Sequence, residues 1–227
     1  MIVGNGFLAQ RFATRFSQAP GLTIFASGVS DSTETRSAEF DRERRLLLQT
    51  LTDTGRLVYF GSCAVACPLR NDSPYIRHKR DMEALVVGTP GGLVLRLPQL
   101  AGAHGQRNTL TNFLHERIVS GGHFEVWRHA ERNIMDIDDV FTLAAAMIQQ
   151  VPSGGRVLSI ASRQSVAMPA VVAMFERTLG RRANCSLVEK GAPLPIDAPA
   201  AQAMADGLGI NLGPGYTESV IRKYHGQ

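Results

Sequence analysis

A tyrosine and a lysine stand four positions apart, at Tyr75 and Lys79, directly after Pro74, which suits the first turn of a helix. Side chains four positions apart share one face of a helix. A lysine ammonium beside a phenol favours the phenolate and lowers the pKa of the tyrosine. Such a tyrosine can exchange a proton with a carbinol oxygen while hydride moves to or from a nicotinamide. The alternative is a surface helix with a packed tyrosine and a solvated lysine.

A serine, Ser62, follows the strand predicted at residues 57–60. In a parallel sheet, ligands bind outside the carboxyl ends of the strands. The hydroxyl of Ser62 could therefore hydrogen-bond to a substrate oxygen and hold it for Tyr75. A hydroxyl that only caps the turn after the strand is the alternative.

Residues 4–9 read Gly-Asn-Gly-Phe-Leu-Ala and stand between a short apolar run and a helical pattern. Small residues let the backbone approach a pyrophosphate, and the helix N-terminus adds free N–H groups and a partial positive charge. We therefore expect Gly4, Gly6, Phe7 and Leu8 to contact a dinucleotide cofactor. A tight strand-to-helix turn that binds nothing is the alternative.

Short apolar runs alternate with segments of helical period along most of the chain, which predicts a parallel α/β sheet covered on both faces. Core strands are predicted at 22–26, 57–60, 93–97 and 157–160. Helices are predicted at 7–16, 37–51, 74–87, 109–119, 138–149 and 168–179. Residues 191–200 and 208–215 are predicted to be loops, and a polar helix is predicted at the end of the chain.

Composition is that of a globular protein, with 227 residues, 44% hydrophobic and 19% charged, and a net charge of +4. This mild basicity suits a phosphate-bearing ligand but not nucleic acid, because no basic block is present. The longest apolar stretch, residues 140–148, is too short to cross a membrane, and no leader peptide is predicted. Three cysteines without framework spacing indicate core-lining free thiols and no metal site, which predicts a cytoplasmic location.

The order of these motifs resembles the layout of the extended short-chain dehydrogenases, the family of sugar-nucleotide epimerases, dehydratases and ketoreductases. The likeness continues in residues 95–102, Leu-Arg-Leu-Pro-Gln-Leu-Ala-Gly, and in residues 131–140. The resemblance implies a Rossmann-like, doubly wound parallel sheet with fewer strands than usual and a small C-terminal substrate lobe. It implies Ser62, Tyr75 and Lys79 as catalytic residues and NAD or NADP as the cofactor.

The resemblance also assigns binding residues. Tyr75 and Lys79 would contact the cofactor as well as the substrate, together with Ala26, Ser27 and Pro98. Gln99 and Arg132 would bind the substrate.

Arg132 matches the arginine that grips the diphosphate of a sugar nucleotide in the family, a task for which a guanidinium fork is well shaped. A surface ion pair of Arg132 with Glu131 or Asp136 is the alternative.

The chain departs from the family pattern in several places: it is shorter, and Val3 and Ala9 stand where the family has the first and last glycines of its turn. No acidic residue ends the strand at 22–26, which leaves both NAD and NADP open. That strand reads like the fourth strand of the family; if it is the fourth and not the second, strands two and three of the usual fold are deleted. Cys63 and Ala64 follow Ser62 where 4,6-dehydratases have Asp-Glu, which favours an epimerase or a ketoreductase without deciding between them.

We expect a single Rossmann-type domain, with a cofactor-binding core at 1–102 and 138–160 and a substrate lobe at 103–137 and 161–227. The expected partner is a nucleotide sugar, with no nucleic acid and no membrane, and the resemblance is compatible with a homodimer and with polysaccharide biosynthesis. The competing hypothesis is a degenerate member of the family that binds a nucleotide or a partner protein and catalyses nothing.

Overall fold

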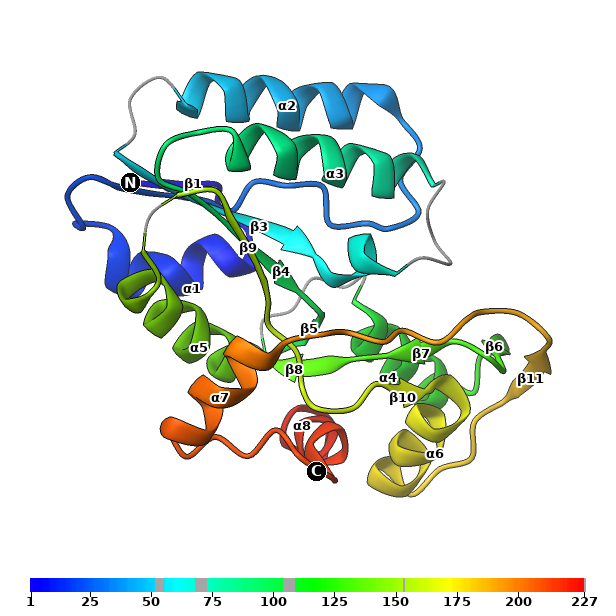
Figure 1. Cartoon of the computed structure of the whole chain (residues 1–227). Helices are drawn as coiled ribbons and strands as arrows, with labels where there is room; N and C mark the ends of the chain where they lie inside the picture. Colours follow the sequence, from blue (N-terminus) through cyan, green and yellow to red (C-terminus); the bar gives the residue numbers. More distant parts are fainter. Residues whose placement is uncertain (52–54, 68–72, 104–108, 153, 227) are drawn as a thin grey trace. The chain divides into compact units, whose positions relative to one another are not determined.

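The computed structural model of the protein describes residues 1–51, 55–67, 73–103, 109–152 and 154–226 (Figure 1). The chain forms two compact units. Unit 1 consists of Met1–Leu97 and Ala144–Ile160, and unit 2 of Pro98–Leu143 and Ala161–Gln227. Each unit is described by itself below.

Unit 1 contains a five-stranded parallel sheet in the order β1-β2-β3-β4-β9. Its strands are β1 (Ile2–Val3), β2 (Leu22–Phe25), β3 (Arg56–Ser62), β4 (Gly92–Leu97) and β9 (Arg156–Ser159). The central strands are almost continuous apolar runs, as expected of strands that are buried on both faces. Parallel strands end at the same edge of a sheet, so Val3, Phe25 and Ser62 mark one edge.

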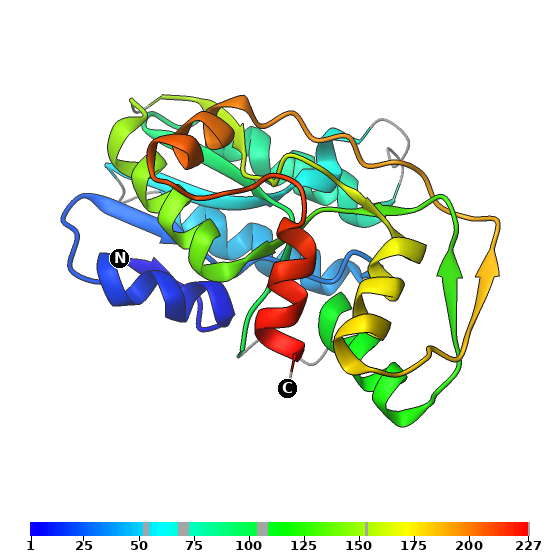
Figure 2. The same cartoon turned by 90° about the horizontal axis from the view of Figure 1, so that it is seen from below.

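Helices cover both faces of this sheet, and consecutive residues of β3 show which helix lies on which face. Tyr59 packs with Leu47 of α2 (Ser37–Leu51) and Met82 of α3 (Pro74–Val87). The ring of Phe60 lies 4.7 Å from that of Phe12 in α1 (Phe7–Phe16). Because neighbouring side chains of a strand point to opposite faces, α1 lies across the sheet from α2 and α3, as Figures 1 and 2 show.

The crossover through α1 has an unusual hand. The connections from β1 to β2, β2 to β3 and β3 to β4 each move one strand in the same direction along the sheet. With α1 on the face opposite α2 and α3, its crossover must have the opposite hand to theirs. Crossovers between parallel strands are right-handed in about 98% of cases, so crossovers of both hands within one sheet depart from a strong rule.

Strands two and three of the usual doubly wound order have no counterpart in unit 1. The segment from Gly4 to Ser37 is described throughout, and it holds α1, β2 and a loop. In the usual order, 3-2-1-4-5-6, strand one is central. Here β1 pairs with β2 alone among the described strands. Of the two alternatives left open by the sequence, the structure therefore supports deletion.

Unit 2 is built from three two-stranded sheets and several helices. β5 (Gln99–Ala101) pairs with β8 (Ile134–Asp136), β6 (Phe124–Trp127) with β11 (Cys185–Val188), and β7 (Glu131–Arg132) with β10 (Val166–Ala167). Its helices are α4 (Leu110–Ser120), α6 (Met168–Leu179), α7 (Pro199–Gly207) and α8 (Tyr216–His225). α5 (Ile137–Gln150) contributes residues to both units.

Buried Asp136 anchors α8 to the rest of unit 2. Its carboxylate accepts hydrogen bonds from the ammonium of Lys223 at 2.6 Å and from the hydroxyl of Tyr224 at 2.7 Å. The hydroxyl of Tyr216 donates to Asp139 at 2.6 Å. The C-terminal helix is thus tied to the end of β8 and to the first turn of α5.

The predicted fold class is confirmed, as are the helices at 37–51, 74–87 and 168–179. Three expectations were wrong. The strand near 157–160 is not a core strand, since β9 lies at the end of the sheet and Arg156 and Val157 are exposed. The loop predicted at 191–200 gives way to α7 at Pro199. Cys63 and Cys67 are buried, but Cys185 is exposed and does not line the core. Within the described residues, no helix is long and apolar enough to span a membrane.

Candidate active site

Ser62 and Tyr75 meet at the carboxyl edge of the sheet in unit 1. Ser62 is the last residue of β3, and Tyr75 is the second residue of α3, whose N-terminus is capped by Ser73. Tyr75 is buried, with 5% of its surface exposed, and its hydroxyl is hydrogen-bonded to the side chain of Ser62. The Ser62 hydroxyl also accepts the backbone N–H of Ala64 at 3.3 Å, so it caps the turn as well. The structure thus brings the two hydroxyls together.

Tyr75 retains its proton strongly in this site. Burial is the main cause that raises the pKa of Tyr75 to about 12. The hydrogen bond with Ser62 lowers this pKa, and the negative charge of Glu43 raises it further. The expectation that Lys79 lowers the pKa of Tyr75 below its ordinary value is therefore wrong for the protein without a ligand. The reason lies in the hydrogen bonds that Lys79 makes.

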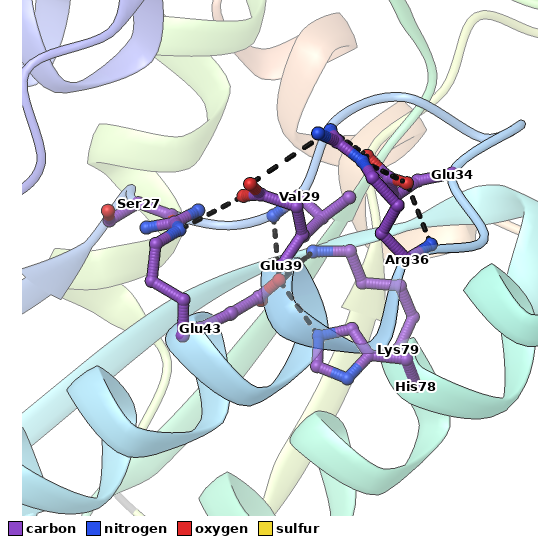
Figure 3. A network of polar contacts seen from close by, with 9 residues as sticks. Ser27, Val29, Glu34, Arg36, Glu39, Glu43, His78 and Lys79 are labelled. Carbon is purple, nitrogen blue, oxygen red and sulfur yellow. Dashed lines mark hydrogen bonds and ion pairs between the residues drawn. The ribbon is translucent and has the colours of Figure 1, made fainter.

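Lys79 shares a face of α3 with Tyr75 but donates its hydrogen bonds elsewhere. Its ammonium lies 5.8 Å from the centre of the Tyr75 ring, within cation–π range. It donates to Glu43 Oε1 at 3.0 Å and to the hydroxyl of Tyr59 at 3.1 Å (Figure 3 shows the bond to Glu43). Only 2% of Lys79 is exposed, so the alternative of a solvated lysine is excluded.

Glu43 is the residue of this site that the sequence analysis missed. It is fully buried in α2, although it stands in a charged segment, Asp-Arg-Glu-Arg-Arg. A signal was present, because Glu43, Leu47 and Thr50 recur at helical spacing and form the buried stripe of α2. Charged residues are almost never fully buried unless they are paired, so a glutamate in an apolar stripe indicates a buried partner.

The glycine turn lies beside the end of β2. Gly4 has φ +123°, and a β-carbon there would lie 2.5 Å from the carbonyl oxygen of Ala26. The backbone N–H of Ala26 donates to the carbonyl of Val3 at 2.8 Å. Gly6 is the N-cap of α1 and provides no side-chain cap. The first N–H groups of α1 therefore lie at the same edge of the sheet as Ala26 and Ser27, and no side chain caps them.

Gly28 shows the same close approach over Lys79. A β-carbon on Gly28 would lie 2.7 Å from the Lys79 ammonium and 2.9 Å from Glu43 Oε1. The loop after β2 can rest on this ion pair only because residue 28 has no side chain.

These groups suit a nicotinamide dinucleotide. Backbone surfaces free of side chains and an uncapped helix N-terminus fit a pyrophosphate, while buried hydroxyls and an ammonium fit ribose and carbonyl oxygens. Gly4, Gly6, Phe7, Leu8, Ala26, Ser27, Tyr75 and Lys79 would hold it. Ala26 and Ser27, which directly follow β2, bring no carboxylate to the adenosine ribose.

Three predicted binding residues belong to unit 2. Pro98 follows β4 directly, and Gln99 begins β5, where its N–H donates to the carbonyl of Asn133 at 2.9 Å. Arg132, half-buried in β7, donates from Nη1 to the carbonyl of Glu131 at 2.7 Å. Their roles toward cofactor and substrate remain predictions.

No protein-family model matches the chain, and a search of curated proteins gives no significant match. Several solved structures are similar. UDP-N-acetylglucosamine 4-epimerase from Bacillus cereus has a TM-score of 0.71 at 12% identity, over 99% of this chain and 96% of that one. dTDP-glucose 4,6-dehydratase from Bacillus anthracis strain Ames, in complex with NAD, has a TM-score of 0.69 at 14% identity, over 90% and 71%.

A third similar structure is RMD from Pseudomonas aeruginosa, complexed with NADPH. Its TM-score is 0.69 at 17% identity, over 92% of this chain and 82% of that one. At such identities the similarity establishes the fold, as the resemblance in sequence implied. The chain therefore has the Rossmann-like fold that these three proteins share.

Proposed function

We propose that the protein is an NAD(P)-dependent oxidoreductase or epimerase that acts on a nucleotide-activated sugar. The observation that carries this proposal is the pair of hydroxyls of Ser62 and Tyr75, with the Lys79 ammonium 5.8 Å from the tyrosine ring, at the carboxyl edge of the sheet. A purely structural core has no need of this trio beside a glycine turn. Structures of similar fold hold NAD, NADPH, UDP-glucose or UDP-glucuronic acid, which supports the same ligand classes here.

Each residue of the trio has a distinct role in this proposal. Ser62 holds the reacting oxygen of the sugar by a hydrogen bond. Tyr75 gives a proton to that oxygen when a keto group is reduced and takes one when an alcohol is oxidised. Lys79 binds the cofactor through its ammonium. A bound nicotinamide supplies the acceptor or donor of hydride.

The high pKa of Tyr75 favours one half of this chemistry at neutral pH. A phenol with a pKa of about 12 is protonated throughout the physiological range, so it is ready to protonate a carbonyl oxygen. Abstraction of a proton from an alcohol needs the phenolate, which is scarce. Reduction of a 4-keto sugar therefore suits the site better than oxidation of the parent alcohol.

The substrate assignment rests on unit 2. We assign the diphosphate of the sugar nucleotide to Arg132, whose guanidinium has the shape for two parallel hydrogen bonds to phosphate oxygens. Gln99 offers an amide for a sugar hydroxyl. The abundance of arginine over lysine in the chain, which has three lysines in all, agrees with a ligand that carries phosphate.

The test is hydride transfer, followed at 340 nm with NADH or NADPH and a set of UDP- and dTDP-linked 4-keto sugars. Turnover that requires Tyr75 supports the proposal. Binding of a nucleotide without hydride transfer to any of these sugars favours the competing hypothesis of a catalytically degenerate member. That hypothesis draws on one observation, the neutralisation of Lys79 by Glu43.

A further inference from the structure

Four ionisable side chains are buried together between α2, α3 and β3. Glu43, Tyr59, His78 and Lys79 are each at most 8% exposed. Removing such groups from water costs several kcal/mol for each charge. Replacement of a buried ion pair by apolar side chains is often neutral or stabilising, so the cluster is poorly explained by stability alone.

The carboxylate of Glu43 is held from several sides. Oε1 accepts from the hydroxyl of Tyr59 at 2.7 Å and from Lys79 at 3.0 Å. Oε2 accepts from the N–H of Val29 at 2.6 Å and is paired with Nε2 of His78 at 2.9 Å. Burial alone would raise the pKa of Glu43, but the bond to His78 and the charge of Lys79 bring it down to about 2. Glu43 is therefore a fixed, permanently charged group.

The cluster reaches the carboxyl edge of the sheet through the loop after β2. Val29 belongs to that loop, and the backbone of Gly28 lies directly against the ammonium of Lys79. Figure 3 shows the bonds of Glu43 to Val29, His78 and Lys79. The same helix makes a second connection, in which the guanidinium of Arg42 donates to Glu39 and to the carbonyl of Ser27. One helix thus fixes both the loop and the lysine.

We infer that Glu43 is the counter-ion and positioning residue of Lys79, which it keeps charged and aimed at the loop of residues 26–29 where the cofactor would bind. This inference rests on the proposed function for its cofactor. Other charges also face Lys79, namely Glu83 on its own helix and Arg42 on α2, while Tyr59 contributes a hydroxyl from β3. Of these groups, Glu43 is the carboxylate in direct contact with the ammonium.

Burial and the carboxylate act on Lys79 in opposite directions. Burial lowers the pKa of Lys79, and the charge and hydrogen bond of Glu43 raise it. Removing the charge at residue 43 without changing the shape would leave a buried ammonium with no adjacent counter-ion. Such lysines lose their proton several pH units early.

Lysine NMR measures this directly, because the chain has three lysines, at 79, 190 and 223. We propose to titrate protein labelled with [13C]lysine and to assign the Cε signals with Lys190→Arg and Lys223→Arg. Glu43→Gln should lower the pKa of Lys79 by about 2 units or more. The matched control is Glu83→Gln, which removes the carboxylate paired with Arg96 at 2.7 Å and should move the pKa of Lys79 far less. A pKa of Lys79 that is equal in Glu43→Gln and wild type would overturn the inference.

A second variant guards against failure of Glu43→Gln to fold. Glu43→Asp keeps the charge but shortens the side chain, so Lys79 should stay protonated while its position shifts. NADH affinity, read from nucleotide fluorescence, should then fall about 10-fold at pH 7, the worth of one charge-assisted hydrogen bond. Unchanged affinity in both variants, whatever the pKa of Lys79, would reduce Glu43 to a structural role. Failure of the wild type to bind either NADH or NADPH would refute the proposed function and leave the lysine titration standing as a separate result.

Discussion

The α-carbon of Gly4 lies so close to the carbonyl of Ala26 that a β-carbon on residue 4 would be 2.5 Å from its oxygen. The backbone of Gly4 also has φ +123°, a conformation that side-chain-bearing residues rarely adopt. Both constraints act on the turn that is proposed to hold the pyrophosphate of the cofactor.

Gly4→Ala should therefore destabilise the protein by about 1–3 kcal/mol and weaken NADH binding at least 10-fold. Urea unfolding and nucleotide fluorescence measure the two effects. Gly21→Ala is the matched control, since Gly21 has φ +67° but nothing within 4 Å of the added carbon. If the two variants bind NADH equally well, the close approach of Gly4 has no part in cofactor binding.

Tyr75→Phe should reduce kcat by about 100- to 10,000-fold, because the proton donor is lost while the ring stays packed. NADH affinity and the urea midpoint should stay close to wild type. Tyr224→Phe, which loses a hydrogen bond to Asp136, is the control and should keep its activity. Near wild-type turnover by Tyr75→Phe would remove Tyr75 from the mechanism.

The two directions of the reaction should respond differently to pH. Since the pKa of Tyr75 is raised to about 12, the phenol keeps its proton from acid to moderately alkaline pH. The kcat of keto reduction should then be flat up to about pH 10, while the kcat of alcohol oxidation should rise about tenfold per pH unit. Steady-state profiles with NADH and NAD test this. An oxidation rate that levels off below pH 8 contradicts it, because the base would then titrate near neutrality.

Arg132→Ala should raise KM for the sugar nucleotide by 10-fold or more and leave kcat nearly unchanged. This is the pattern of lost uniform binding. The size follows because a hydrogen bond to a charged group contributes about 1.5–3 kcal/mol. Arg128→Ala removes an exposed arginine that pairs with Glu189 at 2.7 Å, and serves as the control. Equal KM values for the two variants would mean that the diphosphate is bound by other groups.

Selection between NAD and NADP should be weak. No carboxylate follows β2 at Ala26 and Ser27, and β1 has no described neighbour on its other side, so this end of the described sheet offers no carboxylate to accept the ribose hydroxyls or to repel a 2′-phosphate. Arg36, an arginine that could attract that phosphate, is already paired with Glu34 at 2.6 Å. Isothermal titration should give Kd values for NADH and NADPH within about 10-fold. A strong preference for NADH would reveal an acidic group that reaches the ribose.

The sequence predicted what local periodicity and motif order control. Pro74, the preceding Ser73 and the spacing of Tyr75 and Lys79 place α3 and its reactive face, and the structure agrees. The direction of the Lys79 hydrogen bonds could not be predicted in this way. It depends on Glu43, which comes from another helix and is brought near only by packing across β3.

The short strands of unit 2 were missed for a related reason. β6 and β11 are four residues each, too short to establish a period, and they pair across about 60 positions of chain, with β11 largely exposed. The hand of the α1 crossover could not be predicted from the sequence either, because it depends on which face of the sheet each helix covers.

The place of β1 in the sheet has a consequence for how the glycine turn behaves. β1 has two residues, and its described backbone bonds to the neighbouring strand include those from Ile24 to Met1 and from Ala26 to Val3. A strand so short, with one neighbour among the described strands, belongs to the part of a protein that opens locally at low free-energy cost. Molecules with β1 detached have no formed turn, so a ligand can bind only the remaining fraction and its apparent affinity falls in proportion. Saturation with that ligand would in turn close the strand onto the sheet and make the N-terminus one of the better-protected parts of unit 1.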